Sequence, residues 1–265
     1  MFKGIFTLVP LIFLLGSALL LFLVNLNGTT TSSIFKDIYW SQTETGDLTG
    51  SNFRTTRWTS YGICDVDSNG HSINCTKHKA AYPYSPQDNF GTSNELPNDF
   101  KTSRDTYFYL SRVAYALFLV GLAFTVFAII PLFLSICCAG GLFTNICAFL
   151  VFLAFFFTLA AACLITAVHV LGRNTFSDDN FSSKLGKTLF GLTWASVATL
   201  LISFIFTCLI GRSGRKSRGE WHEQDNESLK RHSNDSETSY QRYDTEPTPS
   251  RGIHFFKIGR TKNVE

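Results

Sequence analysis

Two cysteines stand in a polar stretch of the chain, where they could act together chemically. Cys64 and Cys75 are separated by a segment rich in Asp, Ser, Asn and Gly, a composition typical of a turn between strands. In an oxidising compartment the two thiols would form a disulfide. With His71 and His78 they could instead bind a metal, although the paired CxxC and HxxxH spacings of zinc sites are absent from the sequence. The compartment in which this segment lies decides between the two interpretations.

Other candidate chemical groups are sparse. No Ser/His/Asp or paired-carboxylate arrangement has a supporting context, and the pair Asp178 and Asp179 is typical of a solvated loop. His169 is the only histidine in the long apolar segments. Without a carboxylate partner in those segments it is a poor proton relay, and an interface or packing role fits better. We therefore predict no catalytic residues, no bound metal or cofactor, and no enzymatic activity.

Long uncharged segments predict where the chain crosses a membrane. The chain has 265 residues, and no Lys, Arg, Asp or Glu occurs in 4–35, 113–172 or 188–211. About 20 apolar residues cross a bilayer as a helix, so the middle segment must hold two crossings. Gly140 and Gly141 allow the reversal between them. The predicted fold is an all-α bundle of four membrane helices, at 5–26, 113–136, 142–171 and 188–210, with a small loop domain.

Basic residues beside the last span predict the orientation. Arg212, Arg215, Lys216 and Arg218 follow this span directly, which places the C-terminus in the cytoplasm. Residues 1–4, the hairpin 137–141 and the tail 211–265 are then cytoplasmic, whereas the loops 27–112 and 172–187 are extracellular. A cleaved signal peptide is the alternative to the first span. Its apolar run is too long for that, and no good cleavage site follows, so a retained helix is expected.

An extracellular position for the loop 27–112 favours the disulfide over the metal site. The aromatic residues of this loop are expected to pack a small, β-rich core around the bridge. Alternatively, Trp40 and Tyr107–Tyr109 anchor the chain at the lipid head groups. Pro83, Pro86 and Pro97 predict an extended, turn-rich chain over 81–99 rather than a helix.

Three glycosylation sequons fall in the predicted outer loops, at Asn27, Asn74 and Asn180. Asn27 follows the first span closely, and Asn74 directly precedes a cysteine that the disulfide would engage. All three are therefore candidate sites only. Asn226 and Asn234 match the same pattern, but they lie in the predicted cytoplasmic tail, where the pattern has no meaning.

Several ordered motifs resemble the outer loop and second span of the fungal SUR-seven/PalI family of four-span membrane proteins. They are Arg57-Trp58-x-x-Tyr61-Gly62-x-Cys64 with Cys75, Ala81-Tyr82-Pro83-x-Ser85-Pro86-x-Asp88-Asn89-Phe90, and Ser103-Arg104-Asp105-Thr106-Tyr107-Phe108-Tyr109-Leu110. The resemblance continues with Gly191-x-x-Trp194-Ala195-Ser196-Val197 and Gly252-Ile253-x-Phe255-Phe256. More distantly, Trp40 followed by the two cysteines is similar to claudins, with Tyr61 where claudins carry a second tryptophan.

The resemblance implies a structural protein of static plasma-membrane domains, called eisosomes or the membrane compartment of the arginine permease. It further implies links to cell-wall integrity, endocytosis and sphingolipid balance. Expected partners are plasma-membrane lipids (sphingolipids, and inositol lipids as candidates), eisosome proteins and other copies of the chain, but no nucleic acid. The alternative is a membrane sensor or auxiliary signalling subunit of the ambient-pH-sensing type that signals through its tail. A transporter is a weaker alternative, because the spans carry little polar lining.

Small residues and the cytoplasmic edge supply the remaining expectations. Ala160, Ala161 and Ala162 in the third span, and Gly191, Ala195 and Thr199 in the fourth, are expected to pack within the bundle. The basic cluster after the last span anchors it or attracts inositol lipids. Cys137 and Cys138 at the inner hairpin are candidate palmitoylation sites, with buried hydrophobic cysteine as the alternative. The tail 219–251 is predicted to be disordered, and Phe255 and Phe256 beyond it to contact a partner or the membrane surface.

Overall fold

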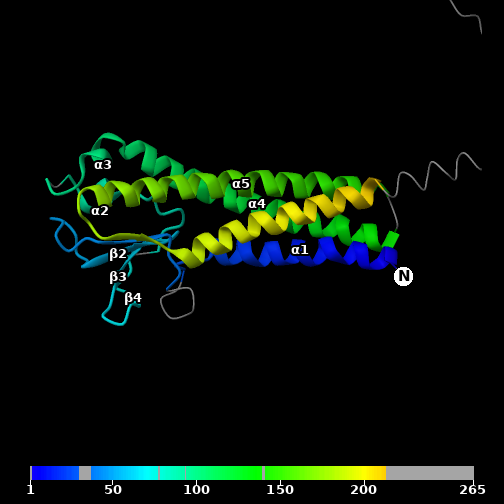
Figure 1. Ribbon diagram of the computed structural model, residues 1–265, viewed down its shortest axis with the longest axis horizontal. Helices are drawn as coiled ribbons and strands as arrows, with labels where there is room; N and C mark the ends of the chain where they lie inside the picture. The colour runs from blue at the N-terminus through cyan, green and yellow to red at the C-terminus, as the bar shows by residue number, and fades with distance from the viewer. Residues whose placement is uncertain (1, 30–36, 77, 93, 139–140, 213–265) are drawn as a thin grey trace, which may run out of the picture. The chain divides into compact units, whose positions relative to one another are not determined.

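The computed structural model describes residues 2–29, 37–76, 78–92, 94–138 and 141–212. This part of the protein contains four long helices. They are α1 (Phe2–Asn25), α4 (Arg104–Cys138), α5 (Gly141–Asp178) and a last helix at Lys187–Arg212 (Figure 1). Each is long and apolar enough to cross a membrane. The predicted four-helix architecture is confirmed: α4 ends at Cys138 and α5 begins at Gly141, and residues 139–140 between them lie outside the described part.

The two middle helices extend beyond the predicted spans at the end that carries the sheet. α4 begins at Arg104 rather than at residue 113, and α5 ends at Asp178 rather than at residue 171. These extra turns hold buried aromatic side chains, Tyr107 in α4 and Phe176 in α5, which pack against the loop domain. Hydropathy locates only the apolar stretch of a helix, so it could not show turns that are stabilised by packing outside the bilayer.

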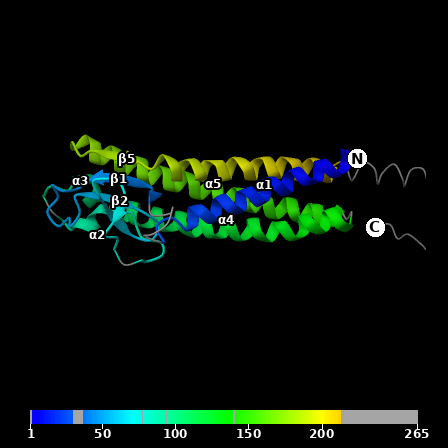
Figure 2. The same cartoon turned by 90° about the horizontal axis from the view of Figure 1, so that it is seen from below.

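A five-stranded antiparallel sheet is built from both predicted outer loops. Its strands are β1 (Ser41–Glu44), β2 (Thr55–Trp58), β3 (Ile63–Val66), β4 (Ser72–Ile73) and β5 (Ser183–Leu185), in the order β4-β3-β2-β1-β5. β5 comes from the loop between α5 and the last helix, and it pairs with β1. The β-rich loop domain is thus confirmed, whereas its fifth strand was not predicted. Both views place the sheet at one end of the helices (Figure 2).

Two short helices correct the prediction of a chain without helices over 81–99. α2 covers Pro86–Phe90 and α3 covers Asn98–Thr102. Pro86 occupies the first turn of α2, and Pro97 directly precedes α3. At a helix start a proline loses no hydrogen bond, because the N–H groups there have no partner within the helix. The prolines therefore begin these helices rather than prevent them.

Aromatic rings form the core between the sheet and the helices, as predicted. Trp58 is 1% exposed and lies edge-on to Tyr84 at 5.1 Å and to Phe90 at 6.0 Å between ring centroids. Phe100 of α3 lies 4.5 Å from Phe176 of α5. Trp40 is 3% exposed, so its predicted role as a lipid-interface anchor is wrong. Of the other anchor candidates, Tyr107 is buried and Tyr109 is exposed.

Small residues bring α4 and α5 together. A Cβ added to Gly121 of α4 would lie 2.4 Å from Thr158 Oγ1 of α5. Ala154, Ala161 and Ala162 of α5 are fully buried. The packing predicted for the alanine run is confirmed at Ala161 and Ala162, with Ala160 only half-buried.

Of the three residues predicted to pack in the last helix, only Thr199 contacts another helix. Gly191 and Ala195 are exposed, and a Cβ on Gly191 would meet nothing within 4 Å, so their expected packing within the bundle is corrected. Contacts with α1 are made by polar groups instead. Ser17 Oγ donates to Thr199 Oγ1 at 2.8 Å, and Ser203 Oγ donates to the Pro10 carbonyl at 3.1 Å. Buried Ser and Thr therefore hold this helix pair, as is common in membranes.

The two glycines predict different responses to the same substitution. Gly121→Val should destabilise the folded protein by about 1–3 kcal/mol, because the branched side chain overpacks the α4–α5 contact. Gly191→Val is the matched control in the last helix and should leave the stability nearly unchanged. Thermal unfolding of both variants in detergent checks the expectation. Equal melting temperatures for the two variants would show that Gly121 does not limit helix approach.

Candidate functional site

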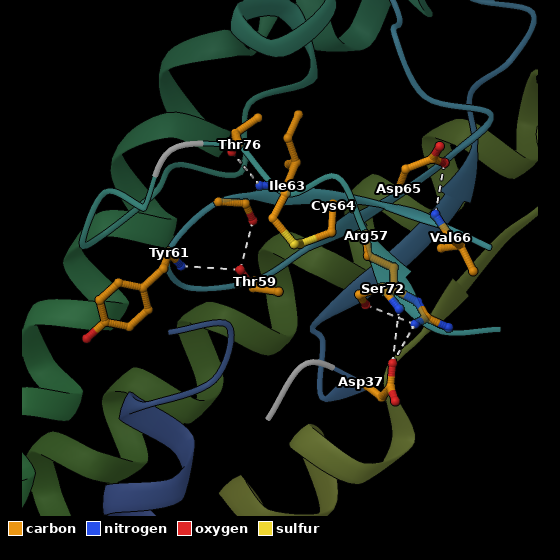
Figure 3. The surroundings of a disulfide bond; sticks show 12 residues. Asp37, Arg57, Thr59, Tyr61, Ile63, Cys64, Asp65, Val66, Ser72 and Thr76 are labelled. Atoms are coloured by element: carbon orange, nitrogen blue, oxygen red, sulfur yellow. Dashed lines mark hydrogen bonds and ion pairs between the residues drawn. A yellow bond between two sulfur atoms is a disulfide. The ribbon is translucent and has the colours of Figure 1, made fainter. Parts of the chain in front are cut away.

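The two polar-stretch cysteines form a disulfide. Cys64 of β3 is bonded to Cys75, which follows β4 (Figure 3). The rival metal site is wrong: His71 pairs with Asp37, its Nδ1 lying 2.9 Å from Oδ2, and His78 is exposed. No group of three or more potential ligands among His, Cys, Asp and Glu forms a metal site within the described part of the chain.

A tight hairpin joins the two bridged segments. β3 and β4 pair through Asp65 with Ile73 and Val66 with Ser72. In the turn, Asp67 Oδ1 accepts hydrogen bonds from the backbone N–H groups of Asn69 and His71. An Asp that bonds the backbone two residues on is the usual stabiliser of such a turn. The Asp/Asn/Gly composition that predicted this turn therefore acts through its side chains.

Arg57 connects the hairpin to the centre of the sheet. Its side chain is nearly buried, with only 7% exposed. Nε donates to Gln42 Oε1 of β1 at 2.8 Å. The other two nitrogens donate to Ser72 Oγ at 3.0 Å and to the Gly70 carbonyl at 2.9 Å, both in the hairpin. The planar guanidinium thus bonds three acceptors in different directions, which the single ammonium of lysine cannot do from one position.

Asp37 and Tyr39 complete the surroundings of this arginine. The Asp37 carboxylate lies 3.5 Å from the guanidinium, and the guanidinium carbon stands 4.4 Å from the centre of the Tyr39 ring. Asp37 Oδ1 also accepts from the backbone N–H of Ser72 at 3.1 Å. The buried charge is therefore both paired and stacked, and the segment before β1 is fastened to the hairpin.

Gly62 and Tyr61 of the motif each make a separate structural contact. The backbone N–H of Ile63 donates to Thr76 Oγ1 at 3.2 Å, and a Cβ on Gly62 would lie 2.6 Å from that oxygen. Only glycine leaves room for this contact behind the disulfide. The hydroxyl groups of Tyr61 and Tyr115 lie 2.9 Å apart and share a hydrogen bond, which ties the loop between β2 and β3 to α4. The tyrosine at the position of the second claudin tryptophan thus contacts a helix.

Trp40 and His169 form the junction between the sheet and the helices. The Trp40 ring stacks on His169 of α5 at 5.9 Å and on Phe118 of α4 at 6.1 Å. His169 is 1% exposed, and its Nδ1 lies 2.9 Å from Ser41 Oγ of β1. His169 is therefore a packing residue, one of the two roles expected for it.

The prediction of Asn27 as a candidate glycosylation site is wrong. Its side chain is fully buried, and Nδ2 donates to the Val24 carbonyl at 2.6 Å and to Ser60 Oγ at 2.7 Å. Its Oδ1 accepts from the backbone N–H of Ser60 at 2.9 Å. Both ends of the amide are thus used to attach the end of α1 to the loop between β2 and β3, and no glycan fits there. Asn74 and Asn180 are exposed.

A small cavity lies at the junction and is lined by Trp40, Trp58, Tyr84, Tyr115 and His169 among others. It offers about 20 Å³ to the centre of a water-sized sphere, which is room for about one water molecule. Burial raises the pKa of Tyr84 above its ordinary value of 10, so its hydroxyl stays protonated at physiological pH. The aromatic lining and the small volume suit this junction to holding the sheet and the helices together.

Several predicted positions lie outside the parts that the structure describes. They are Arg215, Lys216, Arg218, Phe255 and Phe256, together with the side chains of Cys137 and Cys138 in the last turn of α4. The roles expected for them stay predictions. Arg212 is exposed at the end of the last helix, and Asp178 and Asp179 are exposed at the end of α5.

No sequence pattern pointed to the polar partners of the motif residues. Four of these partners are buried. Ser41 bonds to His169, and Ser60 bonds to Asn27 and Trp40. Gln42 and Ser72 both bond to Arg57. Such residues are ordinary in exposed loops, so their types alone suggest a wet surface. Only an assembled sheet shows which of them face inward.

Comparison with known proteins yields one family. The profile of the SUR7/PalI family matches residues 6–206. The chain is 39% identical to SUR7 family protein FMP45 of Saccharomyces cerevisiae over 208 residues, which is 78% of this chain and 67% of the relative. It is 34% identical to Protein SUR7 of Candida albicans, with 99% of this chain and 97% of the relative covered. The uncharacterized plasma membrane protein YNL194C of Saccharomyces cerevisiae is 33% identical, with 77% and 67% covered.

The Arg57 contacts predict a sharp difference between two arginines of the same loop. Arg57→Lys should lower the free energy of unfolding by about 2 kcal/mol, since it leaves buried acceptors of the hairpin unbonded. Arg54→Lys is the matched control, because Arg54 is exposed. Thermal unfolding of the two variants is the measurement. A melting temperature of Arg57→Lys equal to that of the control would refute the role of the guanidinium.

Removal of the disulfide should lower the free energy of unfolding by a similar amount. Replacing Cys64 and Cys75 together by Ser should destabilise the protein by about 3 kcal/mol, because the bridge closes a short loop and restricts the unfolded chain. Cys163→Ser changes an exposed cysteine of α5 and serves as the control. Unfolding in detergent without reductant gives the comparison. If reductant lowers the melting temperature of the wild type but not of the double variant, the effect belongs to this bridge.

Proposed function

Because the chain belongs to the SUR7/PalI family, we propose that it organises static domains of the fungal plasma membrane and catalyses no reaction. The proposed domains are eisosomes, or the membrane compartment of the arginine permease. Through them the protein would affect cell-wall integrity, endocytosis and sphingolipid balance. The observation that carries the proposal is the family match over residues 6–206, together with relatives that are SUR7 proteins.

The chain is a multi-pass plasma-membrane protein, with four helices able to span the bilayer and a relative described as a plasma membrane protein. We propose that both termini lie in the cytoplasm and the sheet outside. An oxidising exterior would then account for the Cys64–Cys75 bridge. This orientation also places the basic cluster that begins at Arg212 beside the anionic inner leaflet, where each cation contributes about 1 kcal/mol of attraction.

The contacts of the loop domain support a scaffold. Asn27 fixes the sheet to α1, Tyr61 fixes it to α4, and Ser41 and Trp40 fix it to His169 of α5. A domain held at three helices presents one fixed surface, which suits lateral association with lipids, with eisosome proteins and with other copies. The sensor alternative would need the tail to relay a signal, and a transporter would need a polar path between the helices.

Imaging of a tagged copy in fungal cells tests this function. The wild type should form immobile cortical patches that recover little fluorescence after photobleaching. Replacing Phe255 and Phe256 by Ala should disperse the patches if these side chains dock on a partner or the membrane. The matched control replaces the tail residues Tyr240 and Tyr243 by Ala. An even, mobile distribution of the wild-type protein would overturn the scaffold role, whereas a pathway readout that depends on the tail would favour the sensor.

A further inference from the structure

The three outer sequons are equivalent as sequence patterns, but their surroundings in the fold differ. Asn27 is excluded because its amide is buried and bonded at both ends. A glycan attached there would remove the contact between the end of α1 and the loop that follows β2. This asparagine is part of the folded core, and its side chain serves to bond the chain there.

Asn180 is exposed, but it sits in a short tether. α5 ends at Asp178 and the last helix begins at Lys187, with β5 between them. Only residues 179–186 join the two helices, and Ser183–Leu185 of this connection are paired with β1. The sequon is thus held between the end of α5 and a paired strand, and the carbonyl of Ser182 accepts from the backbone N–H of Glu44 at 2.9 Å. Asn180 is therefore a poor acceptor.

Asn74 has none of these restrictions. It lies in the middle of the long connection between α1 and α4, directly after β4, which is an edge strand of the sheet. Its side chain is exposed, and the structure gives it no hydrogen bond to any described residue. Its φ of 48° lies in the left-handed region, which asparagine adopts more readily than most residues. The hairpin holds this amide toward solvent, while the neighbouring Cys75 turns inward to the bridge.

We propose that Asn74 carries an N-linked oligosaccharide. The donor is a polyprenyl-diphosphate-linked oligosaccharide. The Asn74 Nδ2 forms a bond to the anomeric carbon as the carbon–oxygen bond to the diphosphate breaks. The amide loses one proton to the transferase, and the polyprenyl diphosphate leaves. Attached here, the glycan covers the free edge of β4, an edge that would otherwise be open to pairing with another chain.

The proposal rests on the extracellular orientation given under the proposed function. The test expresses the full chain in fungal cells and compares its gel mobility before and after digestion with a peptide N-glycosidase. The wild type should gain mobility by one glycan. Asn74→Asp should migrate with the digested wild type and show no further shift, because aspartate tolerates the same backbone conformation. Asn180→Gln should behave as the wild type does.

A positive control separates the site from the orientation. Asp47→Asn creates a new sequon with Leu48 and Thr49, in the exposed turn between β1 and β2 of the same domain. It should add a second glycan to the wild-type pattern. If Asp47→Asn is glycosylated while Asn74→Asp changes nothing, the Asn74 site is overturned and the orientation stands. If neither the wild type nor Asp47→Asn carries a glycan, the loop is not extracellular, and both proposals fall.

Discussion

The structure depends on polar groups that are buried where the sheet meets the membrane helices. At that depth little water is available, so each donor and acceptor needs a partner within the protein. Asn27 and Trp40 both bond to Ser60, and Ser41 bonds to His169. The Asn27–Ser60 and Ser41–His169 bonds join the loop domain to the end of α1 and to α5. Because an unpaired group would cost about 1–3 kcal/mol, the bonds fix one position of the sheet over the helices.

This constraint explains why the motif residues cluster as they do. Trp40, Arg57, Trp58, Tyr61 and Gly62 do not form one site that contacts a ligand. Trp40 and Tyr61 face α5 and α4, whereas Arg57 faces the hairpin and Gly62 makes room for Thr76. The disulfide lies beside them and holds the hairpin that Arg57 bonds. The motif that resembles the outer loop of the family is thus a set of positions at which the loop domain is closed and attached to the helices.

Sequence reasoning succeeded where one physical quantity dominates. The absence of charge located the four helices, and two cysteines in a polar loop located the disulfide. It failed where the structure of a residue depends on partners that are distant in the sequence. β5 is three residues long and becomes a strand only through β1, and Asn27 looks like a sequon until Ser60 is placed beside it. Gly191 and Ala195 have the small size of packing residues, yet the last helix turns Ser203 and not these two residues toward α1. Residue size permits close approach, but it does not choose the face.

The hydrogen bonds of hydroxyl groups within the helix bundle also limit where this protein can contact other molecules. Ser17, Thr199 and Ser203 bond between α1 and the last helix, and Thr125 and Thr166 bond to carbonyls of their own helices. Hydroxyl groups used in this way are not free to line a path for a polar solute. What these helices present outward is apolar, as the exposed Ile12, Phe127 and Phe149 show. The lipid-facing surface and the sheet are thus left for contacts with other molecules, as the proposed role in organising membrane domains requires.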